Sequence, residues 1–267
     1  MEYKRPTKSF FPRLGGKSRL GKKIVQVLPD NYETMKYCEP FVGGGSVFWR
    51  MNEPVESVLN DLNKDVFHLW VDMKKFGQKI PLMNFSIYNR KLFYDMLEKT
   101  DMPQSPERLY RNLVVSRLSF AGNRYNFVGE KECLKKNGKK TLGKHLKINA
   151  LNYKNALKNV LILNQDYKQV LNKHDDINTF FYLDPPYEKS VSRSSKQWRY
   201  VKEDIISPEE ILEAVKDLKG KFLISYNYSP HIKELFKDYK IKEVSTKYTV
   251  QPKGKSGDVK ELLIYNY

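Results

Sequence analysis

The sequence has few cysteines and histidines, and those it has are not grouped. Cys38 and Cys133 lie far apart, and the four histidines are scattered along the 267 residues. Zinc sites need ligands at short spacings, and disulfide frameworks need several cysteines. We therefore expect a protein of a reducing compartment whose functional site holds no metal.

Long apolar runs are also missing. No stretch approaches the roughly 18 consecutive apolar residues that a membrane-spanning helix needs. Residues 1–6 lack the apolar core of a signal peptide. We expect a cytoplasmic protein with no membrane partner.

Acidic residues are too few to balance the basic ones. The chain has 31 Asp and Glu against 48 Lys and Arg, which gives a net charge of +17 and a pI near 9.6. Such a balance favours a polyanionic partner, and nucleic acid is the first candidate. An anionic membrane surface is the alternative, but no basic amphipathic helix stands apart from the rest of the chain.

The apolar residues that are present predict an α/β fold. With 40% hydrophobic residues, the chain is long enough for one large α/β domain or for a domain with a sizeable insertion. Short apolar runs predict strands, and amphipathic stretches predict helices. The predicted strands are at 35–38, 57–60, 160–163, 180–183, 221–227, 241–250 and 259–265, and the predicted helices are at 20–28, 66–76, 88–97, 106–118 and 208–218.

The most informative stretch is residues 180–187, where a buried-strand pattern is followed by Asp184, Pro185, Pro186 and Tyr187. Prolines cannot donate sheet hydrogen bonds, so the strand ends there, at the edge where open α/β sheets bind ligands. A carboxylate, a free carbonyl and a flat ring suit the amino group of a nucleobase better than a sugar or a phosphate. The alternative is a surface turn with an incidental acid.

Two glycine turns are also candidate binding elements. Gly15, Gly16 and Lys17 open the predicted helix at 20–28, and the glycines at 43–45 follow the first predicted strand. A second helix should begin directly after them, with Val47 and Phe48 in the core. Free backbone N–H groups suit an anion or a nucleotide, although neither spacing matches a P-loop or a dinucleotide fingerprint. A plain turn remains the alternative for the first site, and an adenosyl ligand fits the second.

Acids follow two further predicted strands. Asp61 comes after the second strand, where a carboxylate usually accepts from the hydroxyls of a ribose. Asp166 comes just after the strand at 160–163 and either touches the same ligand or caps the next helix. Asn63 is the better candidate for capping the helix at 66–76, which leaves Asp61 for a ligand.

Residues 77–159 contain no strong buried-strand run, and we interpret them as an inserted helical subdomain between residues 1–76 and 160–267 of the main domain. Residues 116–129 mix arginine, asparagine and aromatic side chains, which read or stack on bases. The candidates there are Arg117, Asn123, Arg124, Tyr125 and Asn126.

Two basic loops suit contacts with phosphates. Residues 131–147 hold seven lysines and one glutamate, and the loop at 251–258 is also basic. Such contacts are blind to sequence and depend steeply on salt, whereas a solvated face is the alternative. The candidates are Lys135, Lys136, Lys139, Lys140, Lys253 and Lys255.

Taken together, four motifs resemble those of the Dam-type (D12 class, α-group) DNA adenine-N6 methyltransferases. They are Phe-x-x-x-Gly-Gly-Lys at 11–17, Glu-Pro-Phe-Val-Gly-Gly-Gly-Ser at 39–46, Asn-Asp-Leu-Asn at 60–63 and Asp-Pro-Pro-Tyr at 184–187. The similarity covers nearly the whole chain. It implies a Rossmann-like, seven-stranded mixed sheet with one antiparallel strand, helices on both faces, and target recognition by the insertion at 77–159.

The resemblance also implies the cofactor and its contacts. S-adenosylmethionine would be the methyl donor and S-adenosylhomocysteine the product, with no metal. Lys17 would contact the methionine end, Asp61 would hold the ribose, and Asp166 would meet the adenine. The site would also involve Arg13, Gly16, Phe41, Gly43, Gly45 and Asp184. Arg13 stands where relatives usually have an aromatic residue, and the Asn-x-Pro-Phe-Gly that commonly follows Glu130 is absent.

The implied reaction is methyl transfer to N6 of an adenine flipped out of duplex DNA. Asp184 and the Pro185 carbonyl would accept the two amine hydrogens, while Tyr187 stacks on the base. Arg124 would read a guanine, as in a target such as GATC. A restriction endonuclease is the expected partner besides DNA. Methylation of another amine, such as cytosine N4 or RNA adenine, and a catalytically silent DNA-binding relative are the alternatives.

Overall fold

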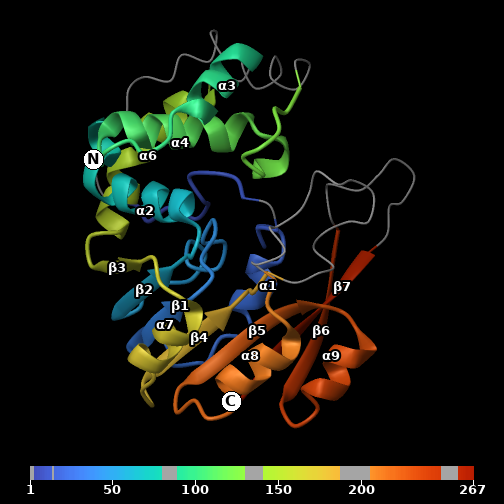
Figure 1. The fold of residues 1–267 in the computed structure, drawn as a ribbon. Helices are drawn as coiled ribbons and strands as arrows, with labels where there is room; N and C mark the ends of the chain where they lie inside the picture. The colour runs from blue at the N-terminus through green and yellow to red at the C-terminus, as the bar shows by residue number, and fades with distance from the viewer. Residues whose placement is uncertain (1–2, 14, 80–88, 130–140, 187–204, 248–257) are drawn as a thin grey trace. The chain divides into compact units, whose positions relative to one another are not determined.

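The computed structural model describes residues 3–13, 15–79, 89–129, 141–186, 205–247 and 258–267 (Figure 1). The chain forms two compact units. Unit 1 consists of Met1–Gly16, Gly43–Trp49 and Asn63–Asn164, and unit 2 consists of Lys17–Val42, Arg50–Leu62 and Gln165–Tyr267. These boundaries differ from the predicted domains, because the glycine turn and the helix at 64–76 belong with the insertion.

Seven described strands form one mixed sheet in the order β3-β2-β1-β4-β5-β7-β6. β1 pairs in parallel with β2 and β4, and β4 pairs in parallel with β5, whereas β7 is antiparallel to β5 and β6. The seven-stranded mixed sheet implied by the resemblance is thus confirmed. The strands are β1 Lys36–Glu39, β2 Glu56–Asn60, β3 Val160–Leu163, β4 Thr179–Leu183, β5 Lys221–Asn227, β6 Lys240–Lys247 and β7 Asp258–Tyr265.

Strand β4 lies between β1 and β5 and carries the central motif to its carboxyl end (Figure 1). All five of its residues are buried, and Phe181 pairs with Cys38 on one side and with Phe222 on the other. A parallel strand covered on both faces is apolar along its whole length, which explains the continuous apolar run in the sequence. Charge enters only at Asp184, directly after the strand.

Two helices of unit 2, α7 and α8, begin at local capping signals. Ser207 and Glu210 form a reciprocal capping box at the start of α8, with Pro208 in its first turn. Asp166 accepts from the Lys168 N–H at 2.8 Å and caps α7. The helices are α1 Gly21–Val25, α7 Tyr167–His174, α8 Pro208–Val215 and α9 Pro230–Leu235, with a 3₁₀ turn at Tyr32–Thr34.

The regular elements described in unit 1 are helices, 3₁₀ turns and strand β3. Asn63 caps α2 by accepting from the N–H groups of Asp65 and Val66, both at 3.1 Å. The helices are α2 Lys64–Phe76, α3 Arg90–Glu98, α4 Pro106–Leu118 and α6 Thr141–Ala156, with 3₁₀ turns at Gly77–Lys79 and Phe120–Gly122. The predicted helices at 66–76, 88–97 and 106–118 are therefore present with small shifts at their ends.

An aromatic cluster forms the centre of unit 1. The rings of Trp49 and Trp70 stack with centroids 5.4 Å apart, and Phe10 and Tyr153 meet them edge-on. These side chains come from the N-terminal segment, the glycine turn, α2 and α6. Their packing explains why segments far apart in the sequence belong to the same unit.

Two helix predictions need correction. Residues 46–50 form turns instead of the predicted helix, although Val47 and Phe48 are in the core as expected. Val47, Phe48, Trp49 and Met51 are all buried, whereas a helix turns only one face toward a core, so packing overrides helix propensity here. In addition, only five residues of the predicted helix at 20–28 form α1.

Candidate active site

Asp184 stands at the carboxyl end of β4 with its side chain 18% exposed. Lys17 donates to Asp184 Oδ1 with Nζ at 2.6 Å, and the Ser225 hydroxyl donates to the same oxygen at 3.1 Å. Pro185 is buried beside it, and the Pro186 carbonyl accepts from the Ile206 N–H at 3.2 Å. The strand end is therefore a fixed corner that carries a partly exposed carboxylate.

Two acceptors at this corner receive no hydrogen bond from the part of the chain that the structure describes. Among the described residues, no donor reaches Asp184 Oδ2 or the Pro185 carbonyl. Backbone and carboxylate oxygens need partners when water is excluded. A ligand with two N–H bonds on one nitrogen satisfies both, which is the chemistry the sequence predicts for this motif.

Lys17 lies between two carboxylates. Its side chain is 5% exposed, and Nζ is 3.9 Å from Oε2 of Glu261, which is fully buried on β7. A buried ammonium needs such partners to keep its charge. The sequence predicted a cofactor contact for Lys17 and did not predict its ion pair with Asp184.

Asn60 connects three strand ends of the site. Its amide Nδ2 donates to the carbonyls of Pro40 and Gln165, and its Oδ1 accepts from the Gln165 N–H, each at 2.9 Å. The Asn60 carbonyl accepts from the Val42 N–H at 2.8 Å. Asn60 is 1% exposed, so the segments after β1, β2 and β3 are held together by a buried, fully bonded amide.

The residues after these strand ends have the chemistry that an adenosyl group requires. Phe41 and Asp61 are half-buried after β1 and β2, which pair in parallel and so end at the same edge as β4. The rings of Phe41 and Tyr167 lie 5.1 Å apart. The Tyr167 hydroxyl is buried without a partner among the described residues, and burial, followed by the charges of Glu210 and Asp166, raises its pKa to about 12. The aromatic rings and the Tyr167 hydroxyl suit the adenine ring, and the Asp61 carboxylate suits the ribose hydroxyls of an adenosine.

Asp166 serves as the cap of α7 and is exposed, which is the alternative that the sequence left open. Gly16 is exposed, and its N–H donates to the Arg13 carbonyl at 3.2 Å. Gly43 and Gly45 have φ angles of 47° and 66°, and the Gly43 carbonyl accepts from Trp70 Nε1 at 2.9 Å. Arg13, Gly16, Gly43 and Gly45 all lie in unit 1, and their role toward a cofactor stays a prediction.

Arg124 is buried in the turn after α4, and its contact with a guanine stays a prediction. It is 4% exposed, pairs with Asp65 at 3.1 Å and donates to Asn112 Oδ1 at 3.0 Å. Burial is the largest influence on its pKa and lowers it to about 10, although Asp65 acts in the opposite direction. In this conformation the guanidinium holds α2, α4 and the following turn together.

The other predicted base-reading residues divide into two groups. Asn123 is 6% exposed, and its Oδ1 accepts from the N–H groups of Tyr125 and Asn126. Arg117 donates to the Phe10 carbonyl at 2.5 Å. Tyr125, by contrast, is 60% exposed, and Asn126 is half-buried. The turn after α4 therefore presents Tyr125 to solvent, while the other side chains build the turn.

Several predicted site residues lie outside the described residues. They are Tyr187, Lys135, Lys136, Lys139, Lys140, Lys253 and Lys255.

Sequence reasoning missed the residues that support the acid. Ser225 is a short polar residue within an apolar strand, and that mismatch is a local signal that could have revealed it, whereas Asn60 belongs to the Asn-Asp-Leu-Asn motif at 60–63 and was assigned no role. Glu261 lies in the last strand, and the link between its carboxylate and Lys17 depends on tertiary structure alone.

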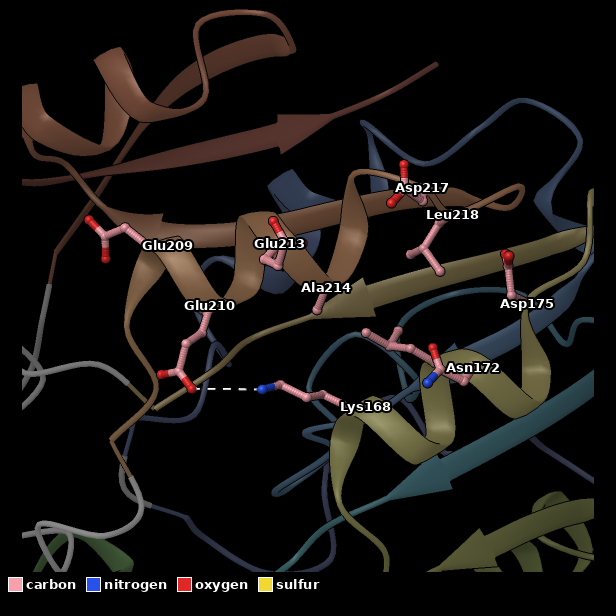
Figure 2. Close-up of a pocket in the computed structure, with 10 residues that line it drawn as sticks. Lys168, Asn172, Asp175, Glu209, Glu210, Glu213, Ala214, Asp217 and Leu218 are labelled. Carbon is pink, nitrogen blue, oxygen red and sulfur yellow. Dashed lines mark ion pairs between the residues drawn. The ribbon is translucent and has the colours of Figure 1, made fainter.

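A separate pocket lies between α7 and α8 (Figure 2). Its volume is about 740 Å³, and its lining includes Asp175, Glu209, Glu213 and Asp217, none of which is a predicted site residue. The described residues contain no cluster of three or more His, Cys, Asp or Glu suited to a metal ion. They also contain no helix long and apolar enough to cross a bilayer.

Comparison with known proteins bears directly on this site. The sequence model of one protein family, described as D12 class N6 adenine-specific DNA methyltransferase, matches residues 14–250. A type II methyltransferase of Lactococcus lactis subsp. cremoris is 28% identical, with 95% of this chain and 93% of that protein aligned. A type II methyltransferase of Methanocaldococcus jannaschii is 27% identical over 97% of this chain and 99% of its own.

Solved structures show only distant likeness. A precorrin-6y C5,15-methyltransferase from Geobacter metallireducens has a TM-score of 0.42 at 10% identity, with both chains covered completely. A putative methyltransferase from Escherichia coli has a TM-score of 0.40 at 11% identity and covers 99% of this chain and 98% of its own. These likenesses are too remote to bear on the function.

Proposed function

The chain belongs to the D12 class of N6 adenine-specific DNA methyltransferases, and we propose that it methylates an adenine held at Asp184 after the base has been flipped out of the duplex. The reaction is site-specific methylation of DNA at adenine N6, as the family match and the two type II relatives indicate. The proposal adds how this chain holds the base, because an N6 amine cannot be reached inside a stacked duplex.

The observation that carries the proposal is a pair of acceptors at the end of β4 to which no described residue donates. Asp184 Oδ2 and the Pro185 carbonyl accept the two N6 hydrogens, which withdraws the nitrogen lone pair from conjugation with the ring. Tyr187 stacks on the flipped adenine. Fixed acceptors in a rigid corner position the amine without reorganisation, and such positioning is the largest contribution that this chain makes to the rate.

S-adenosylmethionine supplies the electrophilic methyl group when it is bound. Asp61 accepts from the ribose hydroxyls, and Phe41 with Tyr167 provides the face and the hydroxyl for the adenine ring. Lys17 is a cation beside the acid of the motif, and we assign it to the carboxylate of the methionine end. The assignments of Asp61, Phe41 and Tyr167 are supported by the donor, acceptor and ring types present after strands of the sheet.

Duplex DNA is held by charge and by the turn after α4. The lysines at 135, 136, 139, 140, 253 and 255 contact phosphates, and Tyr125 contacts bases from its exposed position. Because Arg124 is buried in an ion pair, we assign it to support of this turn instead of guanine reading.

A restriction endonuclease that cuts the same sequence is the proposed biological partner, since the relatives are named type II methyltransferases. Sequencing of methylated adenines in DNA from cells that express the chain gives the target. Nucleases that cut this target should then fail on the same DNA. Cleavage that is equally fast with and without the expressed chain would contradict the protective role.

The test of the reaction uses tritiated S-adenosylmethionine, duplex DNA and digestion of the product to nucleosides. The wild-type chain should yield N6-methyldeoxyadenosine, and Asp184→Asn should lower the rate at least about a hundredfold, because an amide has a donor group in place of one acceptor oxygen. Asp217→Asn is the matched control, an exposed carboxylate in the pocket between α7 and α8. Label in N4-methyldeoxycytidine, or label retained by Asp184→Asn, would refute the proposal.

DNA docking has its own test. Replacing Lys135, Lys136, Lys139 and Lys140 with glutamine should reduce the salt dependence of DNA binding, with the slope of log K against log salt falling by about 3 to 4. Lys216 and Lys237 pair with nearby glutamates, and their replacement is the control. An unchanged slope in the fourfold variant would place phosphate contacts elsewhere.

A further inference from the structure

Behind Asp184, three side chains on neighbouring strands form a hydrogen-bonded chain. The Tyr182 hydroxyl lies 2.9 Å from Ser225 Oγ, and Ser225 Oγ lies 3.1 Å from Asp184 Oδ1. Leu183 of β4 pairs with Ile224 of β5, so the next positions along, 184 and 225, are neighbours on the same face. Strand alternation places Tyr182 on this face as well.

The donor and acceptor of each of these two hydrogen bonds follow from counting the hydrogens. A serine hydroxyl has one hydrogen, and Ser225 donates it to the Asp184 carboxylate, which cannot donate in return when ionised. The Tyr182 hydroxyl must therefore donate to Ser225. Burial, followed by the negative charge of Asp184, raises the pKa of Tyr182 well above its ordinary value, so this donor keeps its hydrogen.

The result is an asymmetric carboxylate. Oδ1 receives Lys17 and Ser225, whereas no described residue donates to Oδ2. Lys17 alone does not fix the plane of the carboxylate, because an ammonium on a flexible stem is a point charge with three rotating donors. Ser225 is fully buried on a central strand and has a single side-chain torsion before its oxygen, so it sets a direction.

We propose that Ser225, aligned by the Tyr182 hydroxyl, is a positioning residue for methyl transfer that turns Asp184 so that Oδ2 accepts the substrate amine. The inference rests on the proposed function of Asp184. Neither residue touches the substrate, so both act through the orientation of the acid.

This role makes a prediction that a purely structural role does not. Removing the Ser225 hydroxyl should lower the single-turnover rate about tenfold to a hundredfold, the equivalent of one hydrogen bond to a charged group. Tyr182→Phe should lower it less, because Ser225 remains and only its alignment is lost. Since Tyr182 acts through Ser225, adding Tyr182→Phe to Ser225→Ala should change the rate no further.

The experiment measures single-turnover methyl transfer, affinity for S-adenosylmethionine by calorimetry and thermal unfolding for wild type, both single variants and the double variant. The affinity should stay within about twofold of wild type, because the effect lies in the reacting geometry. Thr179→Val is the matched control. Thr179 lies on β4, as Tyr182 does, and its fully buried hydroxyl donates to the His174 carbonyl at 2.8 Å. This substitution should lower the unfolding temperature and leave the rate unchanged.

Three outcomes overturn the inference. A Ser225→Ala variant that reacts at the wild-type rate shows that the hydroxyl does not position the acid. Rate losses that multiply in the double variant show that the two hydroxyls act separately. A loss of rate in Thr179→Val equal to that in Ser225→Ala attributes the effect to general destabilisation. If the wild-type chain transfers no methyl group, the proposed function itself fails. If the wild-type chain is active and one of the three outcomes is observed, only the role of Ser225 fails.

Discussion

The glycine turn after β1 gives a prediction of stability that the structure makes quantitative. Gly43 and Gly45 both have positive φ, at 47° and 66°. A Cβ at position 43 would lie 3.6 Å from the Arg13 side chain, which is ordinary contact. A Cβ at position 45 would lie 2.7 Å and 2.8 Å from two ring atoms of Trp70, which is an overlap.

The two substitutions to alanine therefore share the cost of a left-handed backbone conformation, and only Gly45→Ala adds the cost of steric overlap. The left-handed conformation costs an alanine about 1–2 kcal/mol, and the loss of unfolded-state freedom offsets about 0.4–1 kcal/mol of that, which leaves about 1 kcal/mol for Gly43→Ala. Overpacking adds about 1–3 kcal/mol, so Gly45→Ala should cost about 2–4 kcal/mol in total. Trp70 cannot move aside easily, because it is fully buried and stacked on Trp49.

Urea unfolding followed by far-ultraviolet circular dichroism measures both free energies of unfolding without relying on the perturbed tryptophans. The expected order of stability is wild type, then Gly43→Ala, then Gly45→Ala, with about 1–3 kcal/mol between the two variants. Equal stability of the two variants would refute the reasoning from the Trp70 contact. A more stable Gly45→Ala would refute the assignment of the turn itself.

Three further predictions concern single buried groups. In a Cys133→Ser background, Cys38 should react with thiol reagents only after unfolding, even near pH 9. Burial raises the pKa of the Cys38 thiol, and the thiolate is the reactive form. Fast labelling of the folded chain would contradict this. Asn60→Ala should weaken S-adenosylmethionine binding measured by calorimetry, because the loops after β1 and β3 lose their shared amide, and unchanged affinity would show that the loops hold without it. Arg108 forms a buried ion pair with Asp72 at 2.7 Å. Arg108→Met should lower the free energy of unfolding in urea by about 3–5 kcal/mol, because it leaves Asp72 buried and unpaired, and adding Asp72→Leu should recover most of the loss. No recovery would contradict the pairing.

Much of the fold could be predicted because its signals are local. The apolar run before Asp184 indicates a covered parallel strand, and Ser105 before Pro106 marks the start of α4. Capping and strand burial depend on a few adjacent residues, so their patterns can be read in order along the chain. The helix predicted after Gly45 failed because tertiary packing of four apolar side chains overrode the local pattern.

Some residues of the candidate site could also be identified from local sequence, whereas others depended on tertiary contacts. The sequence identified Asp184 and Asp61 from their positions after predicted strands, and both occupy those positions in the structure. The mixture of arginine, asparagine and aromatic residues at 116–129 indicated side chains that read or stack on bases, and the family resemblance implied that Arg124 reads a guanine. The same guanidinium is buried against Asp65 and Asn112, and no local pattern distinguishes an arginine that reads a base from one that holds a turn.

The sequence by itself determined the order of the strands along the chain, the positive charge and the motif that ends β4. Only the tertiary structure decided the partners of that motif: Lys17 lies 167 positions from Asp184 in the chain, and Ser225 lies 41 positions away. The physical reason is that a hydrogen bond between strands depends on which strands pair and in what register, and both are set by the packing of the whole sheet.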